Sequence, residues 1–229
     1  MKIENLNPKV AIFYDWLNQW GGAERVLLDI LKIFPKATVY TLIYDQSKTN
    51  WLPPETKVVT SSLQNLPFSQ KNPIFYTPFY SLTLEKFNFS EFDIVISTTS
   101  SMGQCLLTSP QTLFVCYHHN INRYLYQTPK KYRFLSFLLK HYQKTDFIYG
   151  QRPDYLLTNS KTVQSRISKH YQRPSQIIYP GVDTDFFTPL DLKANSKYYL
   201  VVSRLVDHKK IDLAIHACHR LNKKLIVVG

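Results

Sequence analysis

The chain has 229 residues, of which 44% are hydrophobic and 19% charged, and its formal net charge is +12. This composition excludes an intrinsically disordered chain, because the apolar fraction can form the core of one large α/β domain or two small ones. The positive charge indicates an anionic partner, such as phospholipid headgroups, a phosphorylated acceptor or nucleic acid.

Cysteine usage and hydropathy restrict where the protein works. Cys105, Cys116 and Cys218 are far apart in the sequence, so we predict neither a disulfide framework nor a metal site. Polar residues interrupt the N-terminal segment, and no run of about 18 apolar residues occurs. We therefore expect a cytoplasmic protein without a membrane-spanning helix.

A strand, a glycine turn and a helix follow one another near the N-terminus. Residues 10–14 are an apolar predicted strand that ends before Asp15, and Gly21 and Gly22 precede a predicted helix over 23–34. A Rossmann-like sheet begins in this way, and the glycines allow a ligand to approach the free N–H groups of the helix. The pair lacks both the dinucleotide fingerprint and the P-loop pattern, so it is weak evidence by itself.

Further apolar runs predict a parallel sheet. Strands are predicted at 37–44, 92–98, 113–117, 155–158 and 177–178, with helices or loops between them. The aromatic segment 73–87 favours a core helix over an acceptor-binding or membrane-facing one. A helix with Ser160 as its N-cap is expected to follow the strand at 155–158.

The strand at 113–117 leads directly into His118, His119 and Asn120. A histidine at the carboxyl end of a parallel strand is well placed for a binding site. Adjacent histidines on an extended backbone point in different directions, and no third ligand is evident, so a metal site is not indicated. The alternative is a loop histidine whose ring is satisfied by the backbone.

The middle of the chain is strongly basic. Residues 121–175 contain 11 Lys and Arg against two Asp, a net charge of +9, and basic and apolar residues alternate over 130–149. The stripe at Phe134, Leu135, Leu138, Leu139 and Tyr142 is compatible with a core-packed helix that has a solvated basic face. It is equally compatible with a basic amphipathic helix on an anionic membrane, and both can hold at once.

A second strand, turn and helix lie near the C-terminus. Residues 198–203 are a predicted strand, Asp207 is a candidate N-cap, and a helix is expected from residue 209. The turn carries Arg204 and Lys209, which would lie at the carboxyl edge of a parallel sheet, where α/β folds bind phosphates. A solvated turn with two surface cations is the alternative.

The segment VVSRLVDHKKIDLAIHACHRL (residues 201–221) closely resembles the opening of the second Rossmann domain in family 4 glycosyltransferases of the GT-B fold. The segment VAIFYDWLNQWGGAERVLLDIL (10–31) resembles the N-terminus of the same enzymes, and YPGVDTDFF (179–187) resembles their crossover between domains. The resemblance covers roughly residues 9–229. It implies an α/β chain with a GT-B-like architecture.

The resemblance also implies roles for particular residues. It assigns Arg204 and Lys209 to the diphosphate of a sugar nucleotide, with the backbone of Gly21 and Gly22 close to the same phosphates. His119 takes the position of a histidine that hydrogen-bonds the transferred sugar.

Two further residues, Asp15 and Arg123, are possible contacts of the acceptor or sugar. Asn120 and Ile121 replace the Thr and Pro that the family commonly has after its histidine.

The implied organisation is an acceptor-side Rossmann-like domain over 1–190 and the start of a donor-binding Rossmann domain over 191–229. The family's later glycine-rich loop and two-glutamate motif are absent from the sequence. We therefore expect a C-terminally truncated protein that lacks most of the donor domain, as a fragment, a shortened gene product or half of a split enzyme. By itself the 229-residue chain is expected to be an inactive hexosyltransferase.

The implied function is that of a retaining glycosyltransferase. It would move a sugar, with mannose as first candidate, from a nucleoside-diphosphate sugar such as GDP-mannose to a glycan or lipid-linked acceptor. The relatives it resembles are mannosyltransferases of bacterial surface polysaccharide synthesis, which suggests a place at the inner face of the cell membrane. No cofactor and no metal are implied, because cations and helix ends can neutralise the phosphates.

Two other functions stay open. Loss of the two-glutamate motif is compatible with a non-catalytic lobe that binds a partner. A nucleic-acid binder is permitted by the charge, but no recognition motif supports it, so nucleic acid is not an expected partner.

Overall fold

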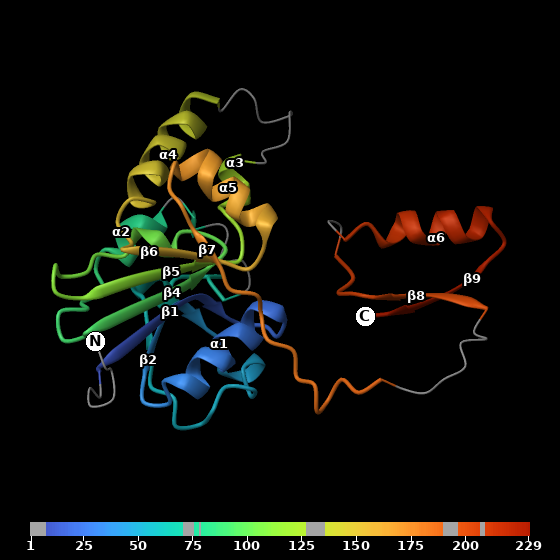
Figure 1. Ribbon diagram of the computed structural model, residues 1–229, viewed down its shortest axis with the longest axis horizontal. Helices are drawn as coiled ribbons and strands as arrows, with labels where there is room; N and C mark the ends of the chain where they lie inside the picture. Colours follow the sequence, from blue (N-terminus) through green and yellow to red (C-terminus); the bar gives the residue numbers. More distant parts are fainter. Residues whose placement is uncertain (1–7, 71–75, 78, 127–135, 190–196, 207–208) are drawn as a thin grey trace. The chain divides into compact units, whose positions relative to one another are not determined.

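The computed structural model describes residues 8–70, 76–77, 79–126, 136–189, 197–206 and 209–229. The chain divides into two compact units, residues 1–181 and 182–229, each with its own sheet (Figure 1). The predicted domain boundary between residues 190 and 191 lies outside the described residues.

Unit 1 (residues 1–181) is built on a seven-stranded sheet in the order β3-β2-β1-β4-β5-β6-β7. All neighbouring strands pair in parallel. The strands are β1 (Val10–Leu17), β2 (Thr38–Tyr44), β3 (Val58–Thr60), β4 (Ile94–Thr99), β5 (Leu113–His118), β6 (Tyr155–Thr158) and β7 (Gln176–Ile177). The strand order reverses between β1 and β4, and open α/β sheets bind ligands outside the carboxyl ends of the strands at such a switch point. The predicted α/β, Rossmann-like fold class is confirmed.

Helices cover the two faces of this sheet unequally (Figure 1). One face carries α1 (Gly22–Ile33), and the other carries α2 (Tyr80–Leu84), α4 (Ser136–Tyr149) and α5 (Lys161–Tyr171). The short helices are η1 (Gln46–Lys48), η2 (Ser62–Asn65), η4 (Gly103–Cys105) and α3 (Arg123–Tyr126).

The central strand β1 contributes to both cores because successive side chains of a strand point to opposite faces. Ile12 and Tyr14 belong to the core under α1, whereas Ala11 and Phe13 belong to the core on the opposite face. A strand buried on both faces reads as a continuous apolar run, which is how the sequence indicated it.

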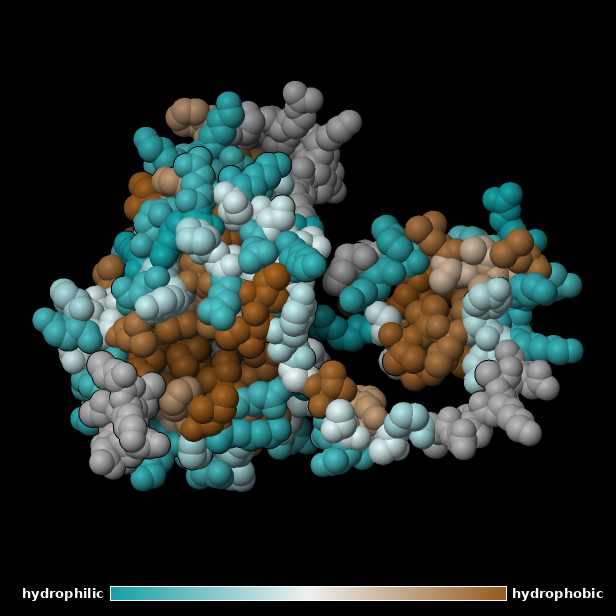
Figure 2. Space-filling view, viewed as in Figure 1, coloured by the Kyte–Doolittle hydropathy of each residue, from teal (hydrophilic) through white to brown (hydrophobic). Residues whose placement is uncertain are grey.

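The α1 face carries a groove of about 450 Å³ between α1 and the strands β4, β5 and β6. Its lining is almost wholly apolar, and Figure 2 shows hydrophobic side chains gathered over the strands of unit 1. The lining side chains include Ile30, Ile33, Ile96, Val115, Tyr117 and Leu157.

Helix α5 begins as the sequence predicted. The backbone N–H of Val163 donates to Ser160 Oγ at 3.3 Å, so Ser160 is the N-cap. The helix ends at Tyr171, and its C-cap Gln172 has a left-handed φ of 54°.

One other helix is shorter than predicted, and a second is described only in part. In the segment 73–87 the described α-helix is α2, preceded by 3-10 residues at 76–77 and 79, and it buries Tyr80 and Leu84 while leaving Leu82 62% exposed. In the segment 130–149 the described helix starts at Ser136. Residues 71–75, 78 and 127–135 lie outside the described part of the chain.

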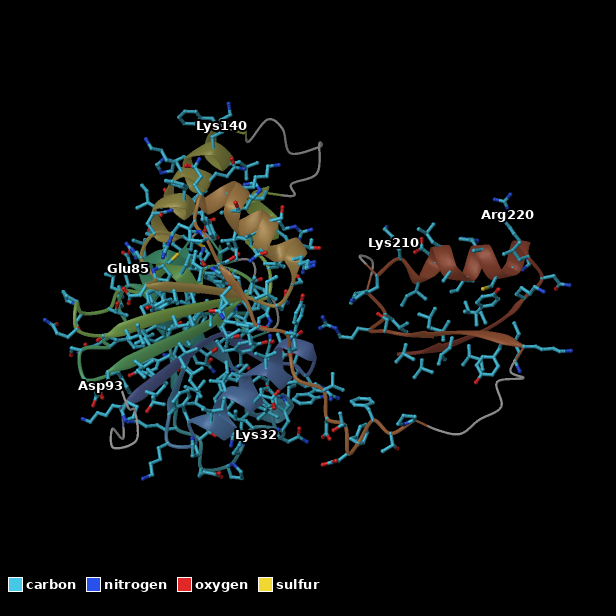
Figure 3. The ribbon with its side chains drawn as sticks, viewed as in Figure 1. Lys32, Glu85, Asp93, Lys140, Lys210 and Arg220 are labelled. Carbon is cyan, nitrogen blue, oxygen red and sulfur yellow. The ribbon has the colours of Figure 1, made fainter. Side chains whose placement is uncertain are left out.

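Unit 2 (residues 182–229) consists of two parallel strands, β8 (Tyr198–Val202) and β9 (Lys224–Val228), and the helix α6 (Ile211–Arg220). The helix begins at Ile211 and not at residue 209, because Lys210 has a left-handed φ of 52° that a helix cannot continue through. Figure 3 labels Lys210 and Arg220 at the two ends of α6. The predicted N-cap Asp207 lies outside the described residues.

Candidate functional site

Asp15 lies at the switch point of the sheet, near the carboxyl end of β1. Its side chain is buried, its Oδ1 accepts a hydrogen bond from Thr99 Oγ1 at 2.7 Å, and its Oδ2 accepts one from the Ser100 N–H at 2.7 Å. Thr99 Oγ1 in turn accepts from the N–H groups of Ser101 and Gly103. One carboxylate therefore holds the turn after β4 against β1.

The proton affinity of Asp15 is unusual for an aspartate. Burial raises its pKa to about 6, against the opposing effect of the hydrogen bonds from Ser100 and Thr99, and the nearby charge of Glu24 raises it further. A carboxyl with a pKa close to the working pH can exchange a proton with a bound substrate.

The glycine turn between β1 and α1 is organised by Glu24, which is buried in the first turn of the helix. Glu24 Oε1 accepts hydrogen bonds from Tyr14 Oη at 2.5 Å and from Gln19 Nε2 at 3.0 Å. A Cβ atom on Gly21 would lie 3.0 Å from Glu24 Oε2, whereas a Cβ atom on Gly22 would contact nothing within 4 Å. The turn is therefore packed tightly at Gly21 and open at Gly22, where α1 begins.

The two adjacent histidines have different surroundings. His118 is fully buried, and its Nε2 lies 3.3 Å from Cys116 Sγ in the core. His119 follows the end of β5; its Nε2 lies 2.8 Å from Thr98 Oγ1, and its backbone oxygen accepts from Asn159 Nδ2 at 3.1 Å. Of the two, His119 is the one that reaches the carboxyl edge of the sheet next to β4.

Burial lowers the pKa of His119 to about 4, so the imidazole is neutral near pH 7. A neutral imidazole offers one hydrogen-bond donor and one acceptor, but no positive charge. This chemistry fits a sugar hydroxyl better than a phosphate.

Arg123 is exposed at the start of α3. Helix α3 is anchored to α4, because Tyr126 Oη of α3 donates a hydrogen bond to the buried Asp146 of α4 at 2.8 Å. Asp146 also accepts from Gln104 Nε2 at 2.6 Å, and Gln143 Nε2 donates to the backbone oxygen of Leu125 at 2.7 Å.

Arg204 and Lys209 lie in the turn between β8 and α6 of unit 2, as predicted, and both are exposed. The backbone N–H of Lys209 donates to the Val206 oxygen at 2.9 Å, which folds the end of the turn back toward the strand.

The structure brings several of the predicted residues to one edge of unit 1. Asp15 meets the turn after β4, Gly21 and Gly22 open α1 beside the end of β1, and His119 is joined to β4 through Thr98. Arg204 and Lys209 belong to the other unit.

Four contributors were not singled out by sequence reasoning: Glu24, Thr98, Thr99 and Ser100. The small polar run directly after an apolar strand was the available signal for the last three. No signal in the sequence marked Glu24 as a buried residue, since a glutamate in the first turn of a helix is normally solvated.

Within the described ranges, no group of three or more His, Cys, Asp or Glu side chains could hold a metal ion. Of the helices that are described, none combines the length and apolarity needed to cross a membrane.

Two crystal structures of HepE from Anabaena are similar to this chain in fold. The complex with UDP-glucose has 16% sequence identity and a TM-score of 0.58, covering 97% of this chain and 70% of HepE. The complex with UDP and glucose has 16% identity and a TM-score of 0.63, covering 96% of this chain and 60% of HepE. The chain thus spans only part of the length of these proteins, and no curated protein sequence matches it.

The sequence itself carries the assignment to a family. Residues 20–186, most of the chain, match the family model described as Glycosyltransferase Family 4. This match includes the glycine turn, the turn after β4, His119 and the beginning of the crossover to unit 2. With a parallel sheet whose fold matches that of GT-B glycosyltransferases, the chain belongs to glycosyltransferase family 4.

Proposed function

We propose that the chain acts in a retaining glycosyltransferase that moves a hexose from a nucleoside-diphosphate sugar to a glycan or lipid-linked acceptor. The observation that carries this proposal is the set of groups at the switch point of unit 1. There a buried carboxyl with a pKa of about 6 and a neutral histidine lie at the edge of the sheet where α1 begins with the open position Gly22.

The donor is proposed to be bound through its diphosphate. Arg204 offers a bidentate fork and Lys209 a mobile charge, and both would stabilise the negative charge that builds on the departing diphosphate. The backbone of Gly21 and Gly22 opens a 12-residue helix, whose N-terminus favours anions. These groups could neutralise the phosphates without a cofactor.

The donor sugar is proposed to be mannose, carried by GDP. This choice rests on the resemblance of the sequence to mannosyltransferases of surface polysaccharide synthesis. The similarity in fold to HepE, solved with UDP-glucose, supports a nucleotide sugar as the class of donor.

His119 is proposed to hydrogen-bond the transferred sugar and not to act as the general base, because its pKa of about 4 makes it a poor proton acceptor near neutral pH. The departing phosphate can itself take the acceptor proton in a retaining reaction. Asp15 already accepts two hydrogen bonds, but a carboxylate has about four acceptor positions. It is proposed to hold an acceptor hydroxyl at one of the remaining positions while it fixes the turn after β4, and Arg123 is proposed as a further acceptor contact.

The acceptor side is proposed to work at an anionic membrane surface, at the inner face of the cell membrane. On α4, Phe137 is 82% exposed and Ile148 54% exposed, and the exposed Lys140 lies at the end of the helix farther from the sheet (Figure 3). Exposed apolar side chains next to cations are typical of a surface helix on anionic lipid.

Calorimetric titration of the chain with GDP-mannose and with UDP-glucose tests the donor assignment. We expect GDP-mannose to bind more tightly than UDP-glucose. Tighter binding of UDP-glucose would overturn mannose, and no binding of either would overturn the proposed function. Where transfer occurs, NMR of the product should show the anomeric configuration of the donor, and an inverted product would contradict the retaining mode.

A further inference from the structure

All three tryptophans of the chain lie close to the glycine turn. Trp16 is near the end of β1, Trp20 directly precedes Gly21, and Trp51 lies in the segment after β2. Trp16 is half-buried, and its Nε1 donates to Tyr80 Oη at 3.2 Å. Trp20 differs, because 42% of this large apolar residue is exposed.

The Trp20 ring is held in place although it is exposed. The Trp51 ring lies 5.2 Å away, centroid to centroid, at an interplanar angle of 46°, and the Arg25 guanidinium carbon lies 5.4 Å from the centroid of Trp20. Trp51 Nε1 also donates to the backbone oxygen of Gln19 at 3.0 Å, which ties the segment after β2 to the glycine turn. An exposed ring that is fixed in this way loses little entropy when a ligand covers it.

A purely structural explanation accounts for only part of this arrangement. With Gly21 as N-cap, Trp20 and Arg25 occupy the positions at which a hydrophobic staple fixes the entry of the chain into a helix. A staple is satisfied by burying two apolar side chains. Here its second member is a cation, and much of the indole surface stays in solvent.

We propose that Trp20, supported by Trp51 and Arg25, is a stacking platform for a neutral pyranose ring of the acceptor glycan. A pyranose presents C–H groups on its face and hydroxyls at its rim, so the face can cover an indole while the rim meets polar groups. The Arg25 guanidinium lies over the Trp20 ring and carries N–H groups of the kind that donate hydrogen bonds to such hydroxyls. The proposal rests on the proposed function, which supplies the acceptor as a glycan.

The position of Trp20 in the fold supports an acceptor subsite. Trp20 lies at the carboxyl edge of the sheet, on the connection that leads from Asp15 to Gly21. A sugar stacked on Trp20 would therefore lie at the same edge of unit 1 as Asp15 and His119.

Tryptophan fluorescence offers a direct test of sugar binding at Trp20. Because all of them surround this turn, intrinsic tryptophan fluorescence of the 229-residue chain reports on this region alone. The chain is titrated with mannotriose, cellotriose, maltotriose and chitotriose, and affinities are measured in parallel by saturation-transfer NMR. We expect at least one trisaccharide to bind and to change the fluorescence.

Variants of Trp20 distinguish a loss of stacking from a loss of folding. Trp20→Ala should weaken binding at least about fivefold, and Trp20→Phe should retain most of it, since a smaller ring still stacks. Tyr155→Ala is the matched control, because Tyr155 is an aromatic residue 61% exposed at the amino end of β6, away from the turn. The thermal midpoint of Trp20→Phe should stay close to that of the wild type.

Three results would overturn the platform: no binding of any of the four trisaccharides, equal binding by Trp20→Ala and the wild type, or equal losses in Trp20→Ala and Tyr155→Ala. A chain that binds trisaccharides through Trp20 but binds neither nucleotide sugar would refute the proposed function and leave the platform standing.

Discussion

Replacing Asp15 by Asn keeps the size of the side chain at the switch point but removes its titrating carboxyl. The amide oxygen can accept from Thr99 or from the Ser100 N–H, but the amide nitrogen cannot accept the other bond. This loss is independent of pH and should lower the free energy of unfolding by about 1–3 kcal/mol.

The ionisation of Asp15 has a pH-dependent effect on the free energy of unfolding, and as the pH rises this effect favours Asp15→Asn over the wild type. Asp15 has a pKa of about 6 in the folded protein against an ordinary 3.8, so its contribution to stability is fully present below pH 3.8 and is lost as the pH rises through 6. The whole shift corresponds to about 3 kcal/mol, of which about 2 kcal/mol should develop between pH 4.5 and 7. The wild type should therefore lose its advantage over Asp15→Asn by about 2 kcal/mol across this range.

Urea unfolding of both proteins at several pH values measures this difference. Tryptophan fluorescence is the appropriate signal, because all three tryptophans belong to unit 1 and unit 2 is then not detected. Glu55→Gln is the matched control, since Glu55 is exposed in the same unit, and its difference from the wild type should stay within about 0.5 kcal/mol. A difference for Asp15→Asn that is flat, or that grows with pH, would refute the account of this carboxyl.

Three further variants test the packing of the turn after β4 and the surface of α4. Gly103→Ala should lower the free energy of unfolding by about 1–3 kcal/mol, because its Cβ atom would overlap the hydroxyl of Ser97, whereas Gly22→Ala, with open space around it, should change it by less than about 1 kcal/mol. Equal losses of unfolding free energy in Gly103→Ala and Gly22→Ala, measured by urea unfolding, would contradict the packing described around the turn after β4. Changing Lys140 and Lys144 together to Gln should reduce pelleting with anionic vesicles at low salt, because each cation near such a surface contributes about 1 kcal/mol. Binding to neutral vesicles should be weak, and about 0.5 M salt should release the wild type; unaltered pelleting of the double variant would exclude α4 as the membrane contact.

The main strands of unit 1 could be predicted because each contains an apolar run, which in β1 and β2 is buried on both faces of the parallel sheet. The strand β3 was missed, since it has three residues, all of intermediate burial. The helix α2 was overestimated, because an aromatic segment indicates burial but not the length of the helix.

The candidate site could be predicted only where the chain itself marks it. Gly21, Gly22 and His119 stand directly at the ends of strands or the start of a helix, which is visible in the sequence. The partner of Asp15 is 84 residues away at Thr99, so the pairing depends on the order of the strands. The burial of Glu24 depends likewise on Tyr14 and Gln19, which a helical pattern does not include.

Calorimetric titration of GDP-mannose into the wild type, Arg204→Ala, Lys209→Ala and Lys223→Ala tests the central claim most directly. Lys223 is the matched control, because it is an exposed cation of unit 2 next to the amino end of β9. Loss of a charge-assisted bond to the diphosphate should weaken binding at least about tenfold in Arg204→Ala and in Lys209→Ala, and Lys223→Ala should bind as the wild type does. Equal affinities in all four proteins would contradict a nucleoside-diphosphate sugar held by the turn between β8 and α6.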